Sequence, residues 1–367
     1  MLSRIEYSPR LFKGFITSTL FYETGYGLEN KKEFYYLEVA PGQGQYAWKD
    51  YNLNNLKELN EFEISQFADQ SRFIRVYTPT NLYVKVLQNQ LSFSFNLKPE
   101  RILHEKNNAV AKFISRIATQ TVYRVDNKTY DNGEFFNPKF FTSLVNDTAL
   151  LSTNYALRQS LFFNQSAAVF GADYTLANNK NKQLLLNGYD SRDNLTHEVR
   201  LRLNFLKAWS INGTGVTGTK SYTSRYFSAR NYSILFYDVE QKLSFQPSTA
   251  FRLSGIYKLT QKQNNIEGGF QKSIISDYAA EIKFNQSEKG SFNLRADFLT
   301  ISYNDTENSP VAYEMLNALR PGYNYTWSIS YQRNLSNNIQ ISINYDGRLS
   351  PKSKAVHIGG AQIRAFF

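Results

Sequence analysis

The sequence contains no cysteine, and this absence removes several kinds of chemistry at once. Disulfide bonds, zinc–thiolate sites and cysteine nucleophiles are excluded. Histidine is also scarce: the chain has three, His104, His197 and His357. Around them we find no Ser/His/Asp spacing and no paired-carboxylate motif, so we expect that the protein is not an enzyme.

A second absence is that of any run of about 20 apolar residues, which excludes a helical membrane span. The mean hydropathy is −0.47. The opening residues, Met1 to Arg10, lack the apolar core of a secretion signal. The chain is therefore either a mature protein or the C-terminal part of a longer one. We favour the second interpretation, because the sequence opens almost directly into a strand-like segment.

Clusters of like charge are missing as well. Lys and Arg total 42 against 31 Asp and Glu, which gives a net charge of +11. The basic residues are scattered rather than gathered in runs, so we expect no nucleic-acid binding. A cationic surface of this kind suits anionic lipid headgroups or anionic solutes.

What the chain does have is a strict alternation of apolar and polar residues, with 28 Phe and 26 Tyr. Ile339, Ile341 and Ile343, for example, alternate with Gln340 and Ser342. A period of two indicates β-strand, because successive side chains leave opposite faces of the pleat. An apolar face rich in aromatics, opposite a polar face, suits a sheet between lipid and water. We therefore predict an all-β fold, a transmembrane antiparallel up-and-down β-barrel forming one domain over residues 1–367. The soluble alternative is a large β-sandwich or propeller, whose apolar faces would favour Val, Ile and Leu.

The alternation predicts about fourteen strands, separated by short turns and long connections in turn. The predicted strands are 11–24, 83–98, 109–126, 149–162, 166–177, 194–205, 207–218, 230–245, 249–263, 273–287, 290–304, 321–333, 337–348 and 354–367. The long connections are 25–82, 127–148, 178–193, 219–229, 264–272 and 305–320. Outer-membrane barrels have short periplasmic turns and long outer loops. With a periplasmic C-terminus, an even strand count puts both termini in the periplasm and the 25–82 loop outside.

The last strand carries a resemblance. Ala361, Ile363, Ala365 and Phe367 share one face and end in a terminal Phe. This pattern resembles the C-terminal signature of Gram-negative outer-membrane β-barrel proteins. The resemblance implies residence in the cell outer membrane, contact with outer-membrane lipid and lipopolysaccharide, and insertion by the barrel-assembly machinery. It leaves the subfamily open, and other outer-membrane or periplasmic proteins are possible partners.

The sharpest local motif is Asp50 to Glu61, within the 25–82 loop, which we expect to form a small extracellular subdomain. Calcium takes six to eight oxygen ligands, and an EF-hand loop supplies them from positions 1, 3, 5, 7, 9 and 12. Those positions are Asp50, Asn52, Asn54, the Leu56 carbonyl, Glu58 and Glu61. The sixth position, usually Gly, is Asn55, the residue type that next best tolerates a left-handed backbone. We predict a structural Ca²⁺ site here. The alternative is an ordinary polar turn.

The predicted lumen face collects charges of both signs. They are Arg116, Arg158, Glu198, Arg200, Arg202, Asp238, Glu240, Lys242, Arg252, Lys258, Asp277, Glu281, Lys283, Arg295, Asp297 and Arg364. They suit either a pore lining or a salt-bridged, filled interior. Ser309 to Gly322 reads as a short loop helix that begins after Ser309 and lies either in the mouth or on its rim. We expect a channel or translocation component. The alternative is a non-conducting barrel that anchors a periplasmic domain or partner proteins, or displays its loops in a surface complex.

Overall fold

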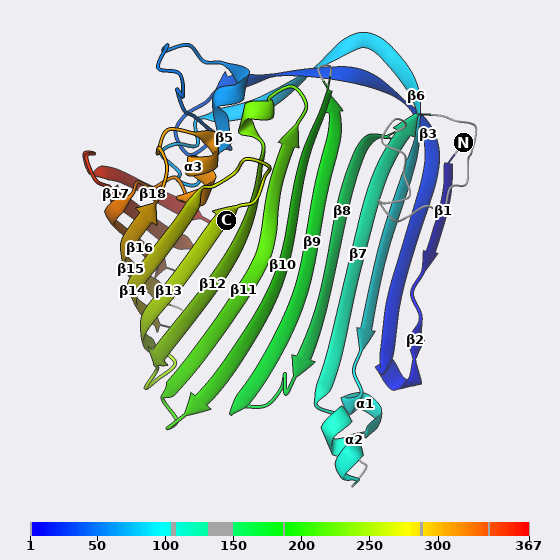
Figure 1. The fold of residues 1–367 in the computed structure, drawn as a ribbon. Helices are drawn as coiled ribbons and strands as arrows, with labels where there is room; N and C mark the ends of the chain where they lie inside the picture. Colours follow the sequence, from blue (N-terminus) through cyan, green and yellow to red (C-terminus); the bar gives the residue numbers. More distant parts are fainter. Residues whose placement is uncertain are drawn as a thin grey trace.

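A computed structural model describes residues 2–103, 108–130, 150–185, 188–286, 289–336 and 338–366. His104 and Phe367 lie outside these ranges. The described chain forms one antiparallel sheet of 18 strands in which most neighbours in sequence are neighbours in space. Figure 1 shows the sheet curling along its length, so that its last strands turn away from the plane of the middle ones.

Most strands follow one another up and down. They are β3 (Ile16–Glu38), β6 (Phe73–Leu97), β7 (Ile117–Tyr130), β8 (Leu150–Phe163), β9 (Phe170–Leu185), β10 (Gly188–Phe205), β11 (Trp209–Ser224), β12 (Tyr232–Phe245), β13 (Phe251–Asn264), β14 (Lys272–Gln286), β15 (Gly290–Tyr303), β16 (Gly322–Ser336), β17 (Ile339–Leu349) and β18 (Val356–Ala365). Ahead of them come β1 (Leu2–Tyr7) and β2 (Arg10–Leu11), while β4 (Tyr46–Trp48) and β5 (Phe62–Ile64) lie between β3 and β6.

Helical structure is confined to the connections. The helices are α1 (Glu100–Leu103), α2 (Ala109–Ile114) and α3 (Pro310–Met315), with 3₁₀ turns η1 (Phe12–Gly14), η2 (Leu59–Glu61) and η4 (Ser228–Arg230). Within the described ranges, none of these helices has the length and apolar character needed to cross a membrane. The Ser309 hydroxyl caps α3 by accepting from the Ala312 N–H at 3.1 Å, and Pro310 opens the helix. The predicted start after Ser309 is confirmed, but the helix ends at Met315, before the predicted end at Gly322.

The alternation places the side chains as the sequence predicts. On the outer face of the curl, apolar side chains stand exposed: Val199 and Leu201 are each 47% exposed, and Tyr237 and Val239 are 52% and 51% exposed. The same face carries Leu203, Ile211, Leu243, Leu253, Tyr257, Ile274, Tyr278, Phe284, Tyr323, Tyr325, Ile343 and Ile363, all exposed. The inner face carries the polar and charged residues. A sheet with this distribution has its apolar side turned outward.

A small buried cluster lies where α3 meets the ends of β14 and β15. Ile275, Leu299 and Ile301 pack there against Ala312, Leu316 and Leu319. The cluster fixes the connection between β15 and β16 to the wall.

The two rims of the sheet differ. At one, the short-turn rim, connections such as 206–208 and 246–250 join strands directly. The other, the long-loop rim, carries α3, η4 and the long excursion between β3 and β6. The prediction of a long 178–193 connection is wrong, because β9 runs to Leu185 and β10 starts at Gly188. The predicted 127–148 connection falls mostly outside the described residues.

The prediction of about fourteen strands is too low. Each predicted strand corresponds to one of the long strands, but β1, β2, β4 and β5 were missed because two- to six-residue strands offer too little alternation to read. The predicted strand 109–126 also begins too early: α2 occupies Ala109–Ile114, capped by Asn108, whose side chain accepts from the Val110 N–H. Closure of the barrel is not seen either, because in the described residues β18 pairs with β17 alone.

The ends of the described chain lie at opposite rims. Leu2 pairs with Gly25, where β3 leaves the sheet at the long-loop rim, whereas Ala365 pairs with Ile339 at the short-turn rim. The prediction that both termini share one rim is therefore wrong for the N-terminus. The cause is the missed strand β1/β2, which adds one more crossing before β3.

Candidate functional site: a lobe across the long-loop rim

The strands β3 and β6 continue well beyond the sheet as a two-stranded ribbon. They pair with each other from Ile16↔Leu97 to Glu38↔Phe73. Pairing with their other neighbours stops at Gly25 for β1 and at Val86 for β7. In Figure 1 this ribbon, dark blue and cyan, crosses the long-loop rim toward α3. It ends in a compact unit of residues 39–72, which we call the rim lobe.

Aromatic packing holds the rim lobe to the tip of the ribbon. The Tyr36 and Phe62 rings stack with centroids 3.9 Å apart, and Phe73 meets Phe62 edge-on at 4.9 Å. The Arg75 guanidinium lies over the rings of Phe34, Tyr36 and Tyr46, at 4.6, 5.5 and 5.2 Å from their centroids. A cation over several rings adds electrostatic attraction to apolar burial. The lobe is therefore a packed unit rather than a loose loop.

Two arginines from distant parts of the sheet fix the lobe in place. Arg230 of η4, only 4% exposed, donates to a Glu63 carboxylate oxygen and to the Phe62 carbonyl, each at 2.8 Å. Arg348 of β17 makes a two-pronged pair with the Asp69 carboxylate, one arm at 2.5 Å. Burial raises the pKa of Glu63, although the adjacent Arg230 alone would lower it. A buried carboxylate of this kind needs its cation, so removal of either partner is costly.

The lobe also packs on α3. Phe67 sits against the buried cluster of α3, β14 and β15, and Arg348 lies over its ring at 4.4 Å. The Tyr313 hydroxyl accepts from the Gln66 N–H and donates to Gln70, both at 3.4 Å. The sequence left open whether the loop helix lies in the mouth or on the rim. The structure places it between the wall and the lobe.

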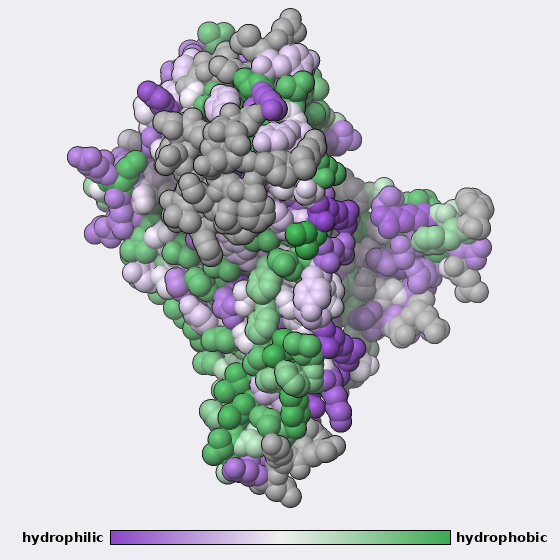
Figure 2. Space-filling model, turned by 90° about the vertical axis from the view of Figure 1, so that its right-hand side faces the viewer, coloured by the Kyte–Doolittle hydropathy of each residue, from purple (hydrophilic) through white to green (hydrophobic). Residues whose placement is uncertain are grey.

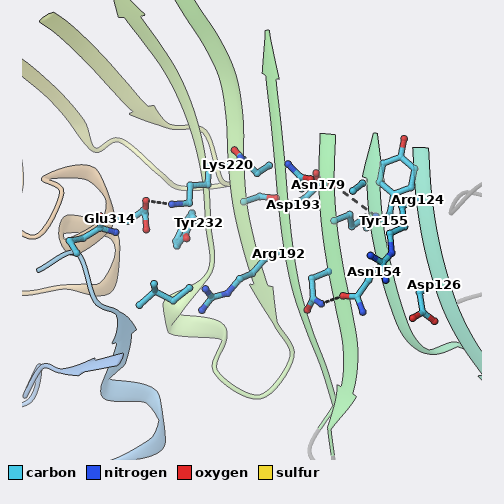
Figure 3. Close-up of a pocket in the computed structure, with 17 residues that line it drawn as sticks. Arg124, Asp126, Asn154, Tyr155, Asn179, Arg192, Asp193, Lys220, Tyr232 and Glu314 are labelled. Carbon is cyan, nitrogen blue, oxygen red and sulfur yellow. Dashed lines mark hydrogen bonds and ion pairs between the residues drawn. The ribbon is translucent and has the colours of Figure 1, made fainter. Parts of the chain in front are cut away.

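Two cavities flank the lobe on the inner side of the sheet. The larger, about 610 Å³, lies between Gln66 and strands β7–β12. Its polar side chains, shown in Figure 3, include Arg124, Asp126, Asn154, Arg192, Lys220 and Glu314. The second, about 380 Å³, lies between the lobe and strands β15–β18 and also touches Gln66. The lobe thus separates two cavities at this rim, each with polar side chains in its lining.

The polar side chains that line the larger cavity make three kinds of contact with one another or with neighbouring residues. Lys220 forms an ion pair with Glu314 of α3, and Asn181 donates to Asn154. Arg192 lies over the Tyr222 ring at 5.2 Å from its centroid. This lining presents both donors and acceptors to a solute.

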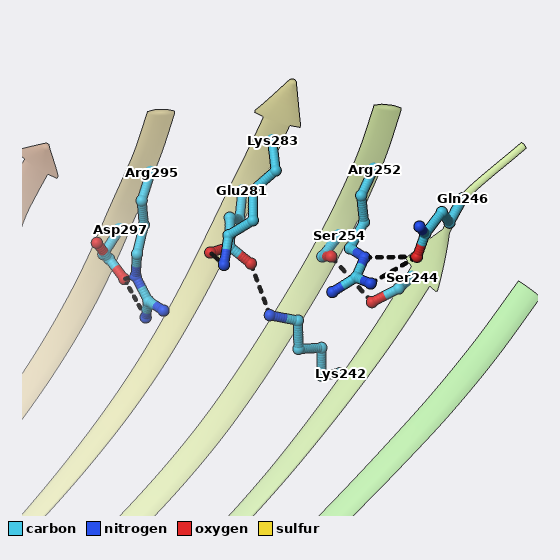
Figure 4. Close-up of polar contacts among 9 residues, drawn as sticks. All are labelled: Lys242, Ser244, Gln246, Arg252, Ser254, Glu281, Lys283, Arg295 and Asp297. Atoms are coloured by element: carbon cyan, nitrogen blue, oxygen red, sulfur yellow. Dashed lines mark hydrogen bonds and ion pairs between the residues drawn. The ribbon is translucent and has the colours of Figure 1, made fainter. Parts of the chain in front are cut away.

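Lower on the wall, most of the predicted inward charges are neutralised along the strands. Glu281 accepts from Lys242 at 2.6 Å and from Lys283 at 2.7 Å, and Arg295 pairs with Asp297 at 2.6 Å (Figure 4). Lys258 pairs with Asp238 at 3.2 Å and Arg200 with Glu198 at 3.2 Å. The inner wall is therefore largely salt-bridged, as the second interpretation of the sequence expects, and a pore lining stays a prediction.

The predicted calcium loop lies in the rim lobe and is closed by its own hydrogen bonds. The Asp50 carboxylate accepts from the N–H groups of Asn54 and Asn55, at 3.2 and 2.8 Å. Asn52 Oδ1 accepts from the Asn54 N–H, and Asn54 Oδ1 from the Leu56 N–H. Asn55 has φ 59°, the left-handed geometry predicted for the sixth position.

The two glutamates of that loop differ in their surroundings. Glu58 accepts from the side-chain amides of Asn52 and Asn54. Glu61 is buried, and its carboxylate accepts from Trp48 Nε1 at 2.9 Å and from the Tyr51 N–H at 3.2 Å. The described residues contain no group of three or more His, Cys, Asp or Glu arranged to hold a metal ion. Calcium binding stays a prediction. It requires the side-chain oxygens of Asp50, Asn52, Asn54 and Glu61 to bind the ion while they also accept hydrogen bonds from N–H groups.

The two described histidines face outward and bind tyrosines. His197 hydrogen-bonds to the Tyr174 hydroxyl and His357 to the Tyr345 hydroxyl, each at 2.8 Å. These contacts are cross-strand pairs on the outer face.

Sequence reasoning missed the residues that hold the lobe. Arg230 and Arg348 lie in segments read as a strand start and a strand end, and their partners Glu63 and Asp69 lie 167 and 279 residues away in the chain. An ion pair across such a separation leaves no local pattern. The one available signal was the length of the 25–82 connection, which pointed to a folded unit.

Comparisons with known proteins add little to this geometry. No protein-family model and no curated protein sequence matches the chain. Among solved structures, the outer membrane channel DcaP of Acinetobacter baumannii matches with a TM-score of 0.40 and 7% sequence identity, covering 97% of this chain and 99% of that chain. The architecture given above rests on the strand pairing of this chain alone.

Proposed function

We propose that the protein is a Gram-negative outer-membrane β-barrel channel whose lumen is constricted by the rim lobe. The observation that carries the proposal is the pairing of an exposed apolar outer face with a polar, charged inner face along the same strands. Contact with lipid makes exposed Val, Leu and Tyr favourable on many consecutive strands. The outer face would contact lipid and lipopolysaccharide, and the barrel-assembly machinery would insert the sheet. The proposal includes no catalytic step.

In the proposed orientation, the short-turn rim faces the periplasm and the rim lobe lies outside the cell. A solute would enter beside the lobe and pass the cavity lined by Arg124, Arg192 and the Lys220–Glu314 pair. The lining offers hydrogen-bond donors, acceptors and both charges, so the proposed substrates are small polar solutes or ions.

Single-channel recording in planar bilayers tests this function. Protein extracted from outer membranes should give discrete conductance steps. Labelling of an Asn54→Cys variant on intact cells tests the orientation, because the parent chain has no cysteine to compete. Labelling that required rupture of the outer membrane would reverse the proposed orientation.

A second candidate function is favoured by the buried contacts of the lobe. Arg230–Glu63 and Arg348–Asp69 hold it firmly across the rim, as in a closed barrel that displays loops or anchors partner proteins. Protein that fractionates with the outer membrane yet carries no current would support this second function.

A further inference from the structure

One connection at the short-turn rim is unlike its neighbours. The connections 164–169 and 246–250 are tight and carry no charged residue. Residues 98–116, between β6 and β7, instead contain α1 and α2 and hold five Lys and Arg against two Glu. In Figure 1 both helices project beyond the ends of the strands. This connection therefore adds a positively charged feature to one place on the rim.

Aromatic side chains gather at the strand ends of the same rim. The ring centroids of Phe163 and Phe170 lie 6.4 Å apart, and those of Trp209 and Phe245 lie 4.8 Å apart. Each of the four is the first or last residue of its strand, and Phe170 pairs with Leu203 of the outer face. Transmembrane barrels carry girdles of aromatic residues at the levels where lipid headgroups meet the apolar band. In the proposed function, these rings therefore lie at the headgroup level of the short-turn rim.

Helix α2 extends this aromatic group with an apolar side of its own. Val110, Phe113 and Ile114 lie three and four positions apart, so they share one side of the helix, and they are 61%, 57% and 40% exposed. The Phe113 ring lies 5.8 Å from the Phe163 ring. At the bottom of Figure 2, where the connection projects, apolar surface gathers beside hydrophilic side chains. The apolar side of α2 is thus continuous with the outer face of the sheet.

Basic residues of the connection lie around a cavity at the rim, which we call the basic rim cavity. It has a volume of about 1030 Å³ and lies between η1, α1, the start of β7 and the turn 164–167. Its described lining includes Lys13, Lys98, Arg101 and Arg116, together with Glu100. Lys and Arg near a membrane surface attract anionic headgroups, and a guanidinium can bind a phosphate through two parallel hydrogen bonds. The cavity is therefore complementary in charge to a phosphate group.

We propose that this connection binds an anionic phospholipid, with the phosphate in the basic rim cavity and the acyl chains along the apolar side of α2. The inference rests on the membrane location in the proposed function. Segments that combine an apolar side with Lys and Arg lie at the membrane interface, because apolar burial and attraction to anionic lipid act together there. A soluble anion or an acidic protein segment would satisfy the charges but would leave Val110 and Phe113 in water. A lipid satisfies both surfaces.

A fluorophore on an introduced cysteine measures where α2 lies, and the parent chain has no cysteine to interfere. In vesicles of phosphatidylcholine and phosphatidylglycerol, a fluorophore at Val110→Cys should show blue-shifted emission and be quenched by brominated acyl chains. The control Thr249→Cys, in an exposed tight turn of the same rim, should show the emission of a fluorophore in water. The control Val199→Cys, on the outer face, should show the emission of a fluorophore in lipid. Emission from Val110→Cys that matches Thr249→Cys would overturn the proposal.

Native mass spectrometry of the protein in detergent measures the headgroup preference. Titrated phosphatidylglycerol should bind more tightly than phosphatidylcholine, and Lys98→Gln or Arg101→Gln should each weaken that binding about fivefold. The matched control is Lys207→Gln, in the tight turn 206–208 of the same rim, which should leave the binding unchanged. Neither pyrophosphate nor polyglutamate, the probes for a soluble anion and for an acidic protein segment, should displace the lipid.

The outcomes separate this proposal from the proposed function. Equal binding of the two lipids, equal effects of Lys98→Gln and Lys207→Gln, or displacement of the lipid by either soluble probe would contradict the lipid site. Protein that does not insert into vesicles would contradict both the lipid site and the proposed function. Inserted protein that binds phosphatidylglycerol as expected but carries no current would contradict the channel alone.

Discussion

At the scale of single residues, the rim lobe depends on a few charges whose surroundings set their importance. The Arg230–Glu63 pair is buried, with side-chain exposures of 5% and 12%, whereas the pair between Lys57 of the lobe and Glu38 of β3 is 47% and 53% exposed. Both have short N–O distances, 2.8 and 2.6 Å. Distance alone therefore does not distinguish them. Burial distinguishes them, because water cannot replace the lost partner of a buried charge.

Replacing Glu63 with Gln should release the lobe from η4. The change leaves the Arg230 guanidinium buried without a counter-charge, at a cost of about 3–5 kcal/mol to the docked state. The readout is the rate of cleavage within residues 39–72 by an added protease. The control is Lys57→Gln, which breaks the exposed pair and should cost about 0–1 kcal/mol. Equal cleavage rates in the two variants would contradict the assigned role of Arg230.

The predicted calcium loop gives a second test at this scale. We expect the double change Asp50→Ala and Glu61→Ala to make the lobe sensitive to protease, as a chelator should in the parent protein, while the sheet stays folded. Glu61 also accepts from Trp48 and Tyr51, so Asp50→Ala alone, which leaves those bonds intact, is the cleaner comparison. If chelator leaves the protease resistance of the parent protein unchanged, and millimolar calcium does not bind, the motif is a polar turn.

At the scale of elements, each strand separates two environments. On β17, Ile341 lies on the outer face and pairs across with Ile363, whereas Ser342 lies on the inner face opposite Gln362. The two residues are neighbours in one strand, so a substitution at either position disturbs the backbone of the same strand. Only the medium that each side chain meets is different.

Ile341→Arg should destabilise the inserted protein by about 2–4 kcal/mol if the position lies near the bilayer midplane. The same substitution at Ser342 faces the polar interior and should cost much less. Urea unfolding of the two variants in lipid vesicles measures the difference. Similar penalties on both faces would mean that the outer face does not meet lipid.

These strands were also the part of the fold that the sequence predicted well. Alternation over ten or more residues identifies the long strands and their faces, as with Tyr237 and Val239 outside and Asp238 inside. It fails where strands are short, as in β4 and β5. It also fails where a segment without clear alternation is a strand because it pairs with a distant one. Residues 27–38 are an example, since they pair with β6. The position of the candidate site was predictable from the long 25–82 connection. Its contacts were not, because Arg348 and Asp69 meet only through the curl of the whole sheet.

At the scale of the whole molecule, the lobe is an addition to the sheet rather than a part of it. The ladders that join β6 to β7, and each later strand to the next up to β18, contain no residue of 39–72. The lobe instead spans the space inside the curl and divides it into cavities of about 610 and 380 Å³. The sheet and the proposed constriction therefore depend on different segments of the chain.

Replacing residues 39–72 with a short Gly/Ser turn should leave the sheet in the membrane and raise its single-channel conductance. The ribbon of β3 and β6 keeps its own pairing, so a turn can join Glu38 to Phe73, which are already partners. A control that replaces residues 265–271, the connection between β13 and β14 at the same rim, should leave the conductance near that of the parent. Unchanged current after removal of the lobe would show that it does not constrict the passage.

The ion pairs of the lobe join residues that lie far apart in the sequence, and this separation affects when the lobe can dock. Glu63 and Asp69 are synthesised early, but their partners Arg230 and Arg348 follow 167 and 279 residues later. Contacts of such long sequence separation form slowly, because the intervening chain must first be ordered. Until β17 is in place, Asp69 lacks its partner Arg348, and the lobe is held only by its contacts with η4 and α3. Strand β17 therefore has two roles, because it pairs with β16 and β18 in the wall and also supplies the arginine that holds Asp69 of the lobe.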